Sequence, residues 1–437
     1  MRKKVFLYST LVLVNLLTIT QADEKIGLEI DSQFGSVKQE SFFVKKVGTT
    51  DRYRQKALVN SGSLKFKYDK KNEIGLRSGA YIKLNANTSE SSSGSKFIAS
   101  DIKLYIENKF GKIEFGNTSS ASSALEVGAE SPARAAGGLK GGWQHWLVHS
   151  GILNTKVNKE IYGAYLTAPQ LPIGYEDSTK SGKINYFSPR VYGFTFNCSY
   201  TPDSKQKGTV HQAKGVLQST DGGYHNVLQQ AIRYEKYFDN GFKFTTSILS
   251  QIAQAKQISY FDVIEDINKS NIKVQHSDRE SLKALQIGTS INYMGLSLLA
   301  EYGNSGKSGA LVSEKSHNTY GNRIGSTYWY ISSVYSIERY GLSIDYMQSK
   351  KATGFCKFKN AKNEYQYVKF SEGSFNEFEA TSFGIDYALM PGLLTYIEAT
   401  KFKFKENDNH TNVSNYNDRR GVSNKGIIIL TGTKIKF

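Results

Sequence analysis

The sequence predicts an all-β fold, namely a transmembrane antiparallel β-barrel of about 16 strands. Three observations lead to this prediction: the composition, the alternation of apolar and polar residues, and the spacing of turn sequences. The composition favours strands and tight turns over helices, because the 437 residues include 28 Tyr, 24 Phe and 39 Gly. The other two observations indicate how the strands are connected.

Apolar and polar residues alternate with a period of two in several segments, which is typical of strands with one apolar face. In residues 73–84 the even positions are mostly apolar: Ile74, Leu76, Ala80, Ile82 and Leu84. Residues 101–107 and 242–252 alternate in the same way. Each segment is therefore predicted to be a strand whose two faces meet different surroundings.

Short and long connections alternate along the chain. Short turns, most of them containing Asn, Asp, Gly or Pro, are predicted at residues 69–72, 109–111, 189–192, 239–241, 294–295, 339–341 and 390–392. Longer polar stretches, interpreted as surface loops, include residues 88–95, 202–226, 303–322 and 406–424. The hairpins supply about 14 strands, and a first strand near residues 26–35 and a last near 425–437 raise the total to about 16.

An even number of strands, with both chain ends on the short-turn side, is what a closed antiparallel barrel requires. Closure is compulsory in a bilayer, because an open sheet edge would leave unpaired N–H and C=O groups in hydrocarbon. The mean hydropathy of −0.44 is compatible with a membrane, since only every second strand residue faces lipid. A soluble β-sandwich or propeller is the alternative, but it does not explain the alternating loop lengths.

Residues 1–22 are predicted to be a secretory signal peptide, and residues 23–437 a single barrel domain. The first segment opens on three basic residues, continues through a largely apolar run and reaches a small-residue cleavage pattern at Ala22. A membrane-anchoring helix is the alternative, but polar residues interrupt the run and it is short for a span. No later stretch approaches 18 consecutive apolar residues, which excludes a bundle of transmembrane helices.

The chain is strongly basic and poor in cysteine. Its formal net charge is +17, and removal of Arg2, Lys3 and Lys4 with residues 1–22 leaves +14. Basic proteins often bind nucleic acid, but no helix-turn-helix, zinc-finger or basic-helix pattern occurs, so no nucleic-acid partner is predicted. Cys198, at a predicted lipid-facing position, and Cys356, in a predicted loop, make neither a disulfide framework nor a metal site. No cofactor is expected.

The C-terminal strand carries the sharpest local pattern. Apolar residues occupy alternate positions on one face, and Gly and Lys occupy the other; the first set is Ile427, Ile429, Ile435 and Phe437, and the second is Gly432, Lys434 and Lys436. The chain ends on the aromatic residue itself. This pattern resembles the last strand of outer-membrane barrels, which the assembly machinery recognises. The resemblance implies that the protein lies in the outer membrane.

Residues 106–117, 183–194 and 432–437 resemble segments of the Gram-negative general porin family. That resemblance implies a 16-stranded trimeric channel with short periplasmic turns and long extracellular loops, through which ions and small hydrophilic solutes diffuse passively. It also implies that the third loop folds into the barrel and forms the constriction. The corresponding segment, residues 119–181, follows the predicted fifth strand.

By strand parity, several cationic residues should line the lumen: Arg77, Lys83, Lys103, Arg233 and Lys243. The alternative is that they solvate the inner wall or pair with Asp101, Glu107 and Glu235. The family resemblance implies acidic residues on the inserted loop, opposite the basic wall, and the candidates are Glu126 and Glu130. The loop also contains an aromatic cluster, Trp143, His145, Trp146 and His149, which is interpreted as packing against the wall or a neighbouring subunit rather than touching solute.

The basic balance indicates an anion preference, because a narrow lumen focuses the field of the wall charges. Alternatively, lysines such as Lys45, Lys46 and Lys315 contact anionic lipid headgroups. The long loops would also suit a barrel that serves as an adhesin or structural surface protein. An outer-membrane hydrolase is disfavoured, since all seven His lie in predicted loops and no strand His lies near a strand Ser. The protein is therefore predicted not to be an enzyme.

Overall fold

The computed structural model describes most of the chain after residue 22. The described ranges are 23–39, 55–87, 96–128, 133–146, 150–153, 161–165, 180–204, 223–263, 272–308, 326–352, 355–359, 365–369, 375–407 and 423–437. Residues 1–22, predicted as a signal peptide, lie outside these ranges, as do most of the loop residues predicted at 88–95, 202–226, 303–322 and 406–424. In the described part of the chain, no helix is long and apolar enough to cross a membrane.

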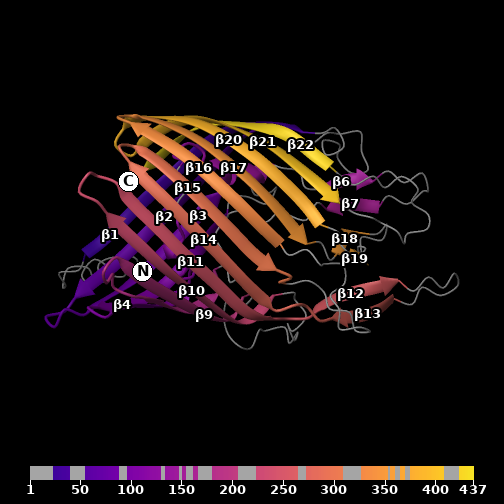
Figure 1. The fold of residues 1–437 in the computed structure, drawn as a ribbon. Helices are drawn as coiled ribbons and strands as arrows, with labels where there is room; N and C mark the ends of the chain where they lie inside the picture. Colours follow the sequence, from indigo (N-terminus) through magenta and orange to yellow (C-terminus); the bar gives the residue numbers. More distant parts are fainter. Residues whose placement is uncertain are drawn as a thin grey trace, which may run out of the picture.

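Sixteen of the 22 described strands form one closed antiparallel barrel, as the sequence predicts (Figure 1). In order they are β1 (Asp23–Gln39), β2 (Lys56–Lys71), β3 (Arg77–Asn87), β4 (Lys96–Asn108), β5 (Gly111–Asn117), β8 (Gly182–Phe187), β9 (Phe194–Asp203), β10 (Tyr224–Tyr237), β11 (Lys243–Ala255), β14 (Leu282–Tyr293), β15 (Leu296–Gly306), β16 (Ser326–Ile337), β17 (Tyr340–Ala352), β20 (Phe375–Met390), β21 (Leu393–Asn407) and β22 (Ser423–Lys436). The barrel closes where β1 pairs with β22.

The predicted short turns all lie at one end of the barrel, and the C-terminus lies at that end as well (Figure 1). Several turns use left-handed backbone at or beside glycine, for example Met294–Gly295, with φ of 45° and 81°. Exposed aromatic residues gather at this rim: Phe110, Tyr192, Tyr293, Tyr340 and Phe437. Aromatic girdles of this kind mark the membrane–water interface of lipid-spanning barrels.

Alternation sorts the side chains of each strand into an outer and an inner set. On β11, the residues Phe244, Thr246 and Ile248 face outward, whereas Thr245, Ser247 and Leu249 are buried inside. The outward set of the barrel is rich in exposed Ile, Leu, Phe and Tyr, which suits hydrocarbon. Cys198 on β9 belongs to the outward set with Phe196 and Tyr200, so it faces the lipid side as predicted.

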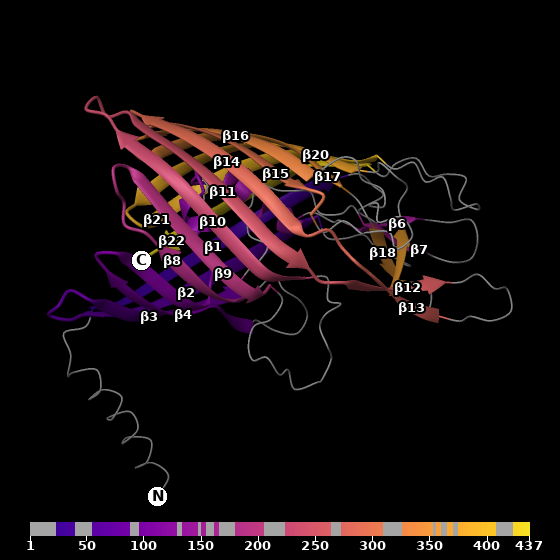
Figure 2. The same cartoon turned by 60° about the horizontal axis from the view of Figure 1, so that its bottom comes forward.

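Short strands also occur in connections that the sequence analysis interpreted as loops. β6 (Ser150–Leu153) and β7 (Ile161–Tyr165) from the third loop form one sheet with β18 (Phe355–Lys359) and β19 (Tyr365–Lys369), and β12 (Ile258–Val263) pairs with β13 (Ile272–Ser277). Both sheets lie beyond the barrel end opposite the short turns (Figures 1 and 2). Cys356 therefore lies on a short strand and not in a loop.

Two histidines depart from the prediction that all seven lie in loops. His225 is on barrel strand β10, where its register partners are Asp203 and Gln254, and His276 is on β13. Alternation did not reveal them because each lies within two residues of the end of its strand.

Candidate pore lining and constriction

The third loop enters the barrel directly after β5 and is fixed there by polar contacts. The Ala121 amide donates to Ser199 Oγ (2.6 Å) and to Asn185 Oδ1 (3.2 Å), and Asn197 Nδ2 donates to the Ala121 carbonyl (2.8 Å). Ala121 is fully buried. Five backbone and side-chain groups are paired by these bonds, so the loop begins against the inner faces of β8 and β9.

Lys140 then connects the loop to the wall at β15. It ends a short 3₁₀ helix, η2 (Gly138–Lys140), and its Nζ lies 3.1 Å from Glu126 Oε1 on the loop and 2.8 Å from Glu301 Oε1 on β15. Its side chain is only 6% exposed. Burial opposes the ammonium charge, but the carboxylates of Glu301 and Glu126 outweigh it, so the pKa of Lys140 is raised above its ordinary value. Lys140 is therefore positively charged at neutral pH.

Two further carboxylates of the wall bind the start of η2. The Gly138 amide donates to Glu398 Oε2 on β21 and the Leu139 amide to Asp345 Oδ2 on β17, each at 2.9 Å. Amides in the first turn of a helix have no partner within it, so these acceptors satisfy groups that would otherwise be left unpaired. Gly138 has φ +58°, and a Cβ added there would lie 1.7 Å from Asp345 Oδ2. Only glycine fits this close approach.

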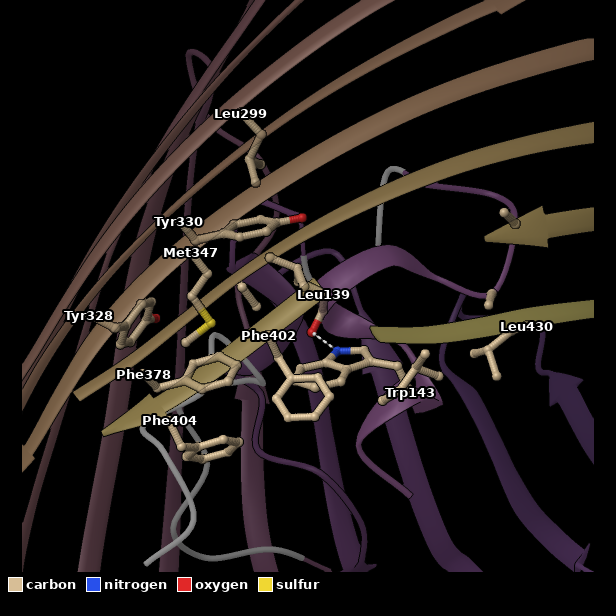
Figure 3. Close-up of a cluster of buried hydrophobic side chains, with 14 of the residues drawn as sticks. Leu139, Trp143, Leu299, Tyr328, Tyr330, Met347, Phe378, Phe402, Phe404 and Leu430 are labelled. Carbon is tan, nitrogen blue, oxygen red and sulfur yellow. Dashed lines mark hydrogen bonds between the residues drawn. The ribbon is translucent and has the colours of Figure 1, made fainter. Parts of the chain in front are cut away.

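An apolar cluster holds the loop beyond η2 (Figure 3). Trp143 is fully buried and stacks on Phe378 of β20 and Phe402 of β21, with ring centroids 5.8 and 6.4 Å apart. Its indole N–H donates to the Leu139 carbonyl at 3.0 Å. The inner wall of β15–β22 supplies further members, among them Tyr330, Met347, Phe404 and Leu430. This part of the lumen is therefore filled by protein and excluded from solvent.

The remaining contacts carry the loop past β20 to β22 and β1. Arg134 lies 2.6 Å from Asp386 on β20, and Lys434 on β22 donates to the Ala135 carbonyl at 2.5 Å. Trp146, in the 3₁₀ helix η3 (Gly142–Trp146), donates its indole N–H to Gln33 Oε1 on β1 at 3.1 Å. The loop thus follows the inner wall from β8 through β22 to β1. Its first residues also touch β4, where the Thr118 hydroxyl donates to Asp101 Oδ1 at 3.1 Å, and none of the described contacts joins the loop to the inner faces of β2 and β3.

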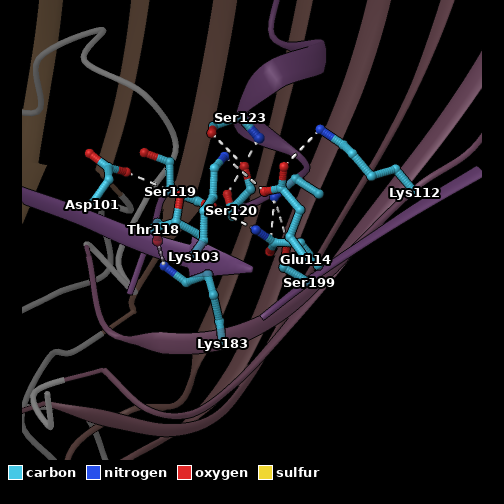
Figure 4. A network of polar contacts seen from close by, with 12 residues as sticks. Asp101, Lys103, Lys112, Glu114, Thr118, Ser119, Ser120, Ser123, Lys183 and Ser199 are labelled. Carbon is cyan, nitrogen blue, oxygen red and sulfur yellow. Dashed lines mark hydrogen bonds and ion pairs between the residues drawn. The ribbon is translucent and has the colours of Figure 1, made fainter. Parts of the chain in front are cut away.

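On the inner wall of β2–β5, several carboxylates are buried beside more exposed cations, and Figure 4 shows Glu114 with Lys103 and Lys112. Glu107 is an exception, because its side chain is 41% exposed. Lys103 and Lys112 contact opposite oxygens of Glu114 at 2.9 and 2.7 Å. The lysine side chains are 21% and 30% exposed, whereas that of Glu114 is 2% exposed. Solvent in the lumen therefore meets the ammonium groups and not the carboxylate that they share.

Asp69 repeats this arrangement nearer the short turns. Its carboxylate is 8% exposed and lies 3.3 Å from Lys67 and 3.7 Å from Arg77, whose side chains are 38% and 44% exposed. Lys180 covers Asp101 in the same way at 3.0 Å. Basic and acidic residues are both frequent on this wall. The charge that solvent meets there therefore depends on which of them are exposed.

The predicted lumen residues all lie on inner faces, but at two levels. Arg77 is the first residue of β3 and Lys243 the first of β11, so both are at the short-turn end. Arg233 is close to Lys243, because both pair with Glu235, at 2.8 and 3.0 Å. Lys83 and Lys103 lie further along β3 and β4. Of these five, Lys83 alone has no ion pair with a described residue.

Of the two predicted loop acids, the structure describes Glu126 alone. Glu126 is 3% exposed and faces the wall, where its carboxylate binds Lys140 and also accepts a hydrogen bond from Gln286 Nε2 at 3.1 Å. Glu130 lies outside the described residues. Trp143 and Trp146 pack against the wall, in line with the interpretation of the aromatic cluster. The side chain of His145 and the whole of His149 lie outside the described part.

Several site residues were missed by the sequence analysis. Lys65 and Lys67 alternate with Leu64, Phe66 and Tyr68, so parity alone would have placed both in the lumen. The wall acids that bind the loop had a weaker signal: Glu301, Asp345 and Glu398 are single carboxylates whose neighbours in the sequence are neutral. Such a residue at an inward position needs a partner, and that partner is the inserted loop.

A family model described as Gram-negative porin matches residues 30–408. The chain belongs to the Gram-negative porin family. This porin is accordingly an outer-membrane β-barrel. Its sequence is similar to uncharacterized proteins of Rickettsia typhi, 22% identical over 96% of this chain and 94% of the relative, and of Rickettsia conorii, 23% identical over the same shares.

Solved structures share the fold of this porin at low sequence identity. The anion-selective porin from Comamonas acidovorans is 11% identical with a TM-score of 0.52, over 95% of this chain and all of that chain. In-vitro folded OmpT, an outer membrane protein of Vibrio cholerae, is 9% identical with a TM-score of 0.52, over 96% of this chain and 99% of that chain. These likenesses support the 16-stranded architecture described above.

Proposed function

We propose that this porin is a passive, anion-preferring channel for ions and small hydrophilic solutes. One observation carries the proposal: on the inner wall of β2–β5, Lys103, Lys112 and Lys67 are partly exposed while their carboxylate partners, Glu114 and Asp69, are buried. A solute passing between the loop and this wall meets a positive surface, and a narrow lumen focuses its field. The similar fold of an anion-selective porin agrees with this proposal.

We place the constriction between the loop, near Lys140, and the wall around Lys83 and Lys103. Arg77, Arg233 and Lys243 would then line the periplasmic mouth, below the level of the loop. Glu126 would not face the solute, because its carboxylate binds Lys140 against the opposite wall. The transverse field would thus arise from the basic wall alone and not from acids on the inserted loop.

Lys83→Glu tests the selectivity and its location. Reversing one charge about 8 Å from a passing ion changes its energy by about 1 kcal/mol at the dielectric constant of water, with opposite sign for anions and cations. After salt screening, we expect roughly a tenfold fall in the anion-to-cation permeability ratio, measured from planar-bilayer reversal potentials in a salt gradient. Arg77→Glu is the matched control at the mouth, and it should change the ratio less.

Each alternative predicts a different recording. An adhesin or structural barrel would give no stepwise conductance from purified wild-type protein. A constriction at the mouth would make Arg77→Glu the stronger of the two variants. We also propose that the porin acts without a catalytic step or cofactor; among the described residues, no group of three or more His, Cys, Asp or Glu could hold a metal ion. We propose a homotrimer as well, since a trimer form is known for the structurally similar OmpT of Vibrio cholerae.

A further inference from the structure

Tyr81 on β3 lies at the centre of a group of lysines on the inner wall of β2–β5. Its register partners are Lys67 on β2 and Lys103 on β4, and Lys83 is the next inward residue of β3. Lys65 on β2 lies directly opposite Lys83. Opposed residues are about 5 Å apart and successive inward residues of one strand about 7 Å, so the four lysines surround the tyrosine.

The charged groups that face Lys83 leave an excess of positive charge. Lys65 and Lys180 repel its ammonium group, whereas Asp101 and Glu29 attract it. Both carboxylates have a closer cation, since Glu29 lies 2.9 Å from Lys65 and Asp101 lies 3.0 Å from Lys180. Three cations therefore share two carboxylates in this part of the wall.

The hydroxyl of Tyr81 adds a hydrogen-bond donor beside these cations. It interacts electrostatically with Lys65, Asp101 and Glu29, so the half-buried side chain extends along the wall toward the level of Lys83. Lys103 Nζ lies 5.4 Å from the ring centroid and covers one face of the ring. The hydroxyl is then the part of Tyr81 that can contact a solute held by Lys83.

We propose that Lys65, Tyr81 and Lys83 form a binding subsite for oxyanions, that is, for solutes that carry a carboxylate, phosphate or sulfate group. This inference rests on the proposed anion-preferring channel and names the class of anion that the constriction favours. An oxyanion has several acceptor oxygens, so it can accept hydrogen bonds from both ammonium groups and from the hydroxyl at once. Chloride is a single spherical acceptor and gains less from donors on different strands.

The test measures how inorganic phosphate reduces the chloride current of the full-length porin in planar bilayers. Wild type should show a saturable decrease as phosphate is added to one side, because a bound oxyanion delays the passage of chloride. Tyr81→Phe removes the hydroxyl but no charge, and it should raise the phosphate concentration for half-block about threefold to tenfold. Tyr105→Phe is the matched control on the same wall; its side chain is 5% exposed, so the half-block concentration should not change.

A second variant tests the charged part of the subsite. Lys83→Gln removes one charge at contact distance and should raise the half-block concentration about fivefold. Lys83→Arg keeps the charge and the donors, and it should retain the block. The midpoint of urea unfolding checks that each variant is folded.

The outcomes separate this subsite from the proposed function. Equal block of wild type and Tyr81→Phe would overturn the subsite, even if reversal potentials in a KCl gradient show an anion preference. The same weakening in Tyr105→Phe would also overturn it, since the effect would then come from the wall as a whole. Block that depends on Tyr81 and Lys83, in a channel without anion preference in KCl, would support the subsite and contradict the proposed function.

Discussion

The inner wall of β2–β5 and the inner wall of β15–β22 both carry buried carboxylates, but their partners differ. On the first wall, Glu114 is covered by the side chains of Lys103 and Lys112, whose ammonium groups remain accessible. On the second, Glu398 and Asp345 accept backbone amides of the loop. The same residue type therefore sets the charge of the lumen on one side and fixes the constricting loop on the other.

This difference predicts that charge changes on the two walls have separate consequences. The loop-bound wall excludes water, so an unpaired charge there is costly, whereas an accessible charge on the basic wall is screened. Variants of the loop-bound wall should change stability, and variants of the basic wall should change permeation.

The largest expected effect is that of Lys140→Met. It leaves the carboxylates of Glu126 and Glu301 buried without their cation, which costs about 3–5 kcal/mol of the free energy of unfolding. We expect a lower midpoint in urea unfolding, followed by tryptophan fluorescence, and greater current noise in single-channel recordings as the loop detaches. Combining Lys140→Met with Glu126→Gln and Glu301→Gln removes the charges as well, and it should recover most of the loss. A single variant as stable as the triple variant would contradict this account.

A smaller effect is expected for Gly138→Ala. The new methyl group would lie 1.7 Å from Asp345 Oδ2, which is too close for any contact. The left-handed backbone at this position adds strain for any residue other than glycine. We therefore expect the free energy of unfolding to fall by about 1–3 kcal/mol. The control is Gly75→Ala in the turn between β2 and β3, which also has a positive φ but has nothing within 4 Å of the new methyl group. If both variants lose the same stability in urea, the close approach to Asp345 does not contribute to the loss.

Much of the fold could be predicted from the sequence, because alternation and turn chemistry are local. Each predicted short turn lies at a hairpin, and both terminal strands lie where they were expected. The route of the loop could not be predicted, since its contacts join residues 206 and 260 positions apart, as in Leu139–Asp345 and Gly138–Glu398. Because these long-range contacts could not be foreseen, Glu126 was expected to face the pore. In the structure its carboxylate faces the wall.

Alternation alone also did not settle which way the side chains of a strand point where its inner face packs against protein instead of water. In residues 401–405, Lys and Phe alternate, and the simplest prediction is that Phe faces lipid and Lys faces the lumen. The structure reverses this order, because Phe402 and Phe404 pack in the cluster around Trp143. A strand that faces a packed loop has an apolar interior, so the inside of such a barrel is polar only where water remains.

The smallest effect on stability is expected at Lys65, whose ion pair with Glu29 on the basic wall spans 2.9 Å between groups that are 29% and 43% exposed. The attraction is screened and both groups can hydrate when separated, so Lys65→Gln should cost about 0–1 kcal/mol. Permeation should still respond, because the exposed carboxylate of Glu29 loses the cation that neutralises it. We expect the reversal potential in a salt gradient to shift toward cation permeability while the urea midpoint stays within error of wild type. Lys65→Gln combined with Glu29→Gln should return the reversal potential toward the wild-type value. A loss of stability comparable to that of Lys140→Met would mean that the basic wall, too, depends on its ion pairs for folding, and the contrast between the two walls would fail.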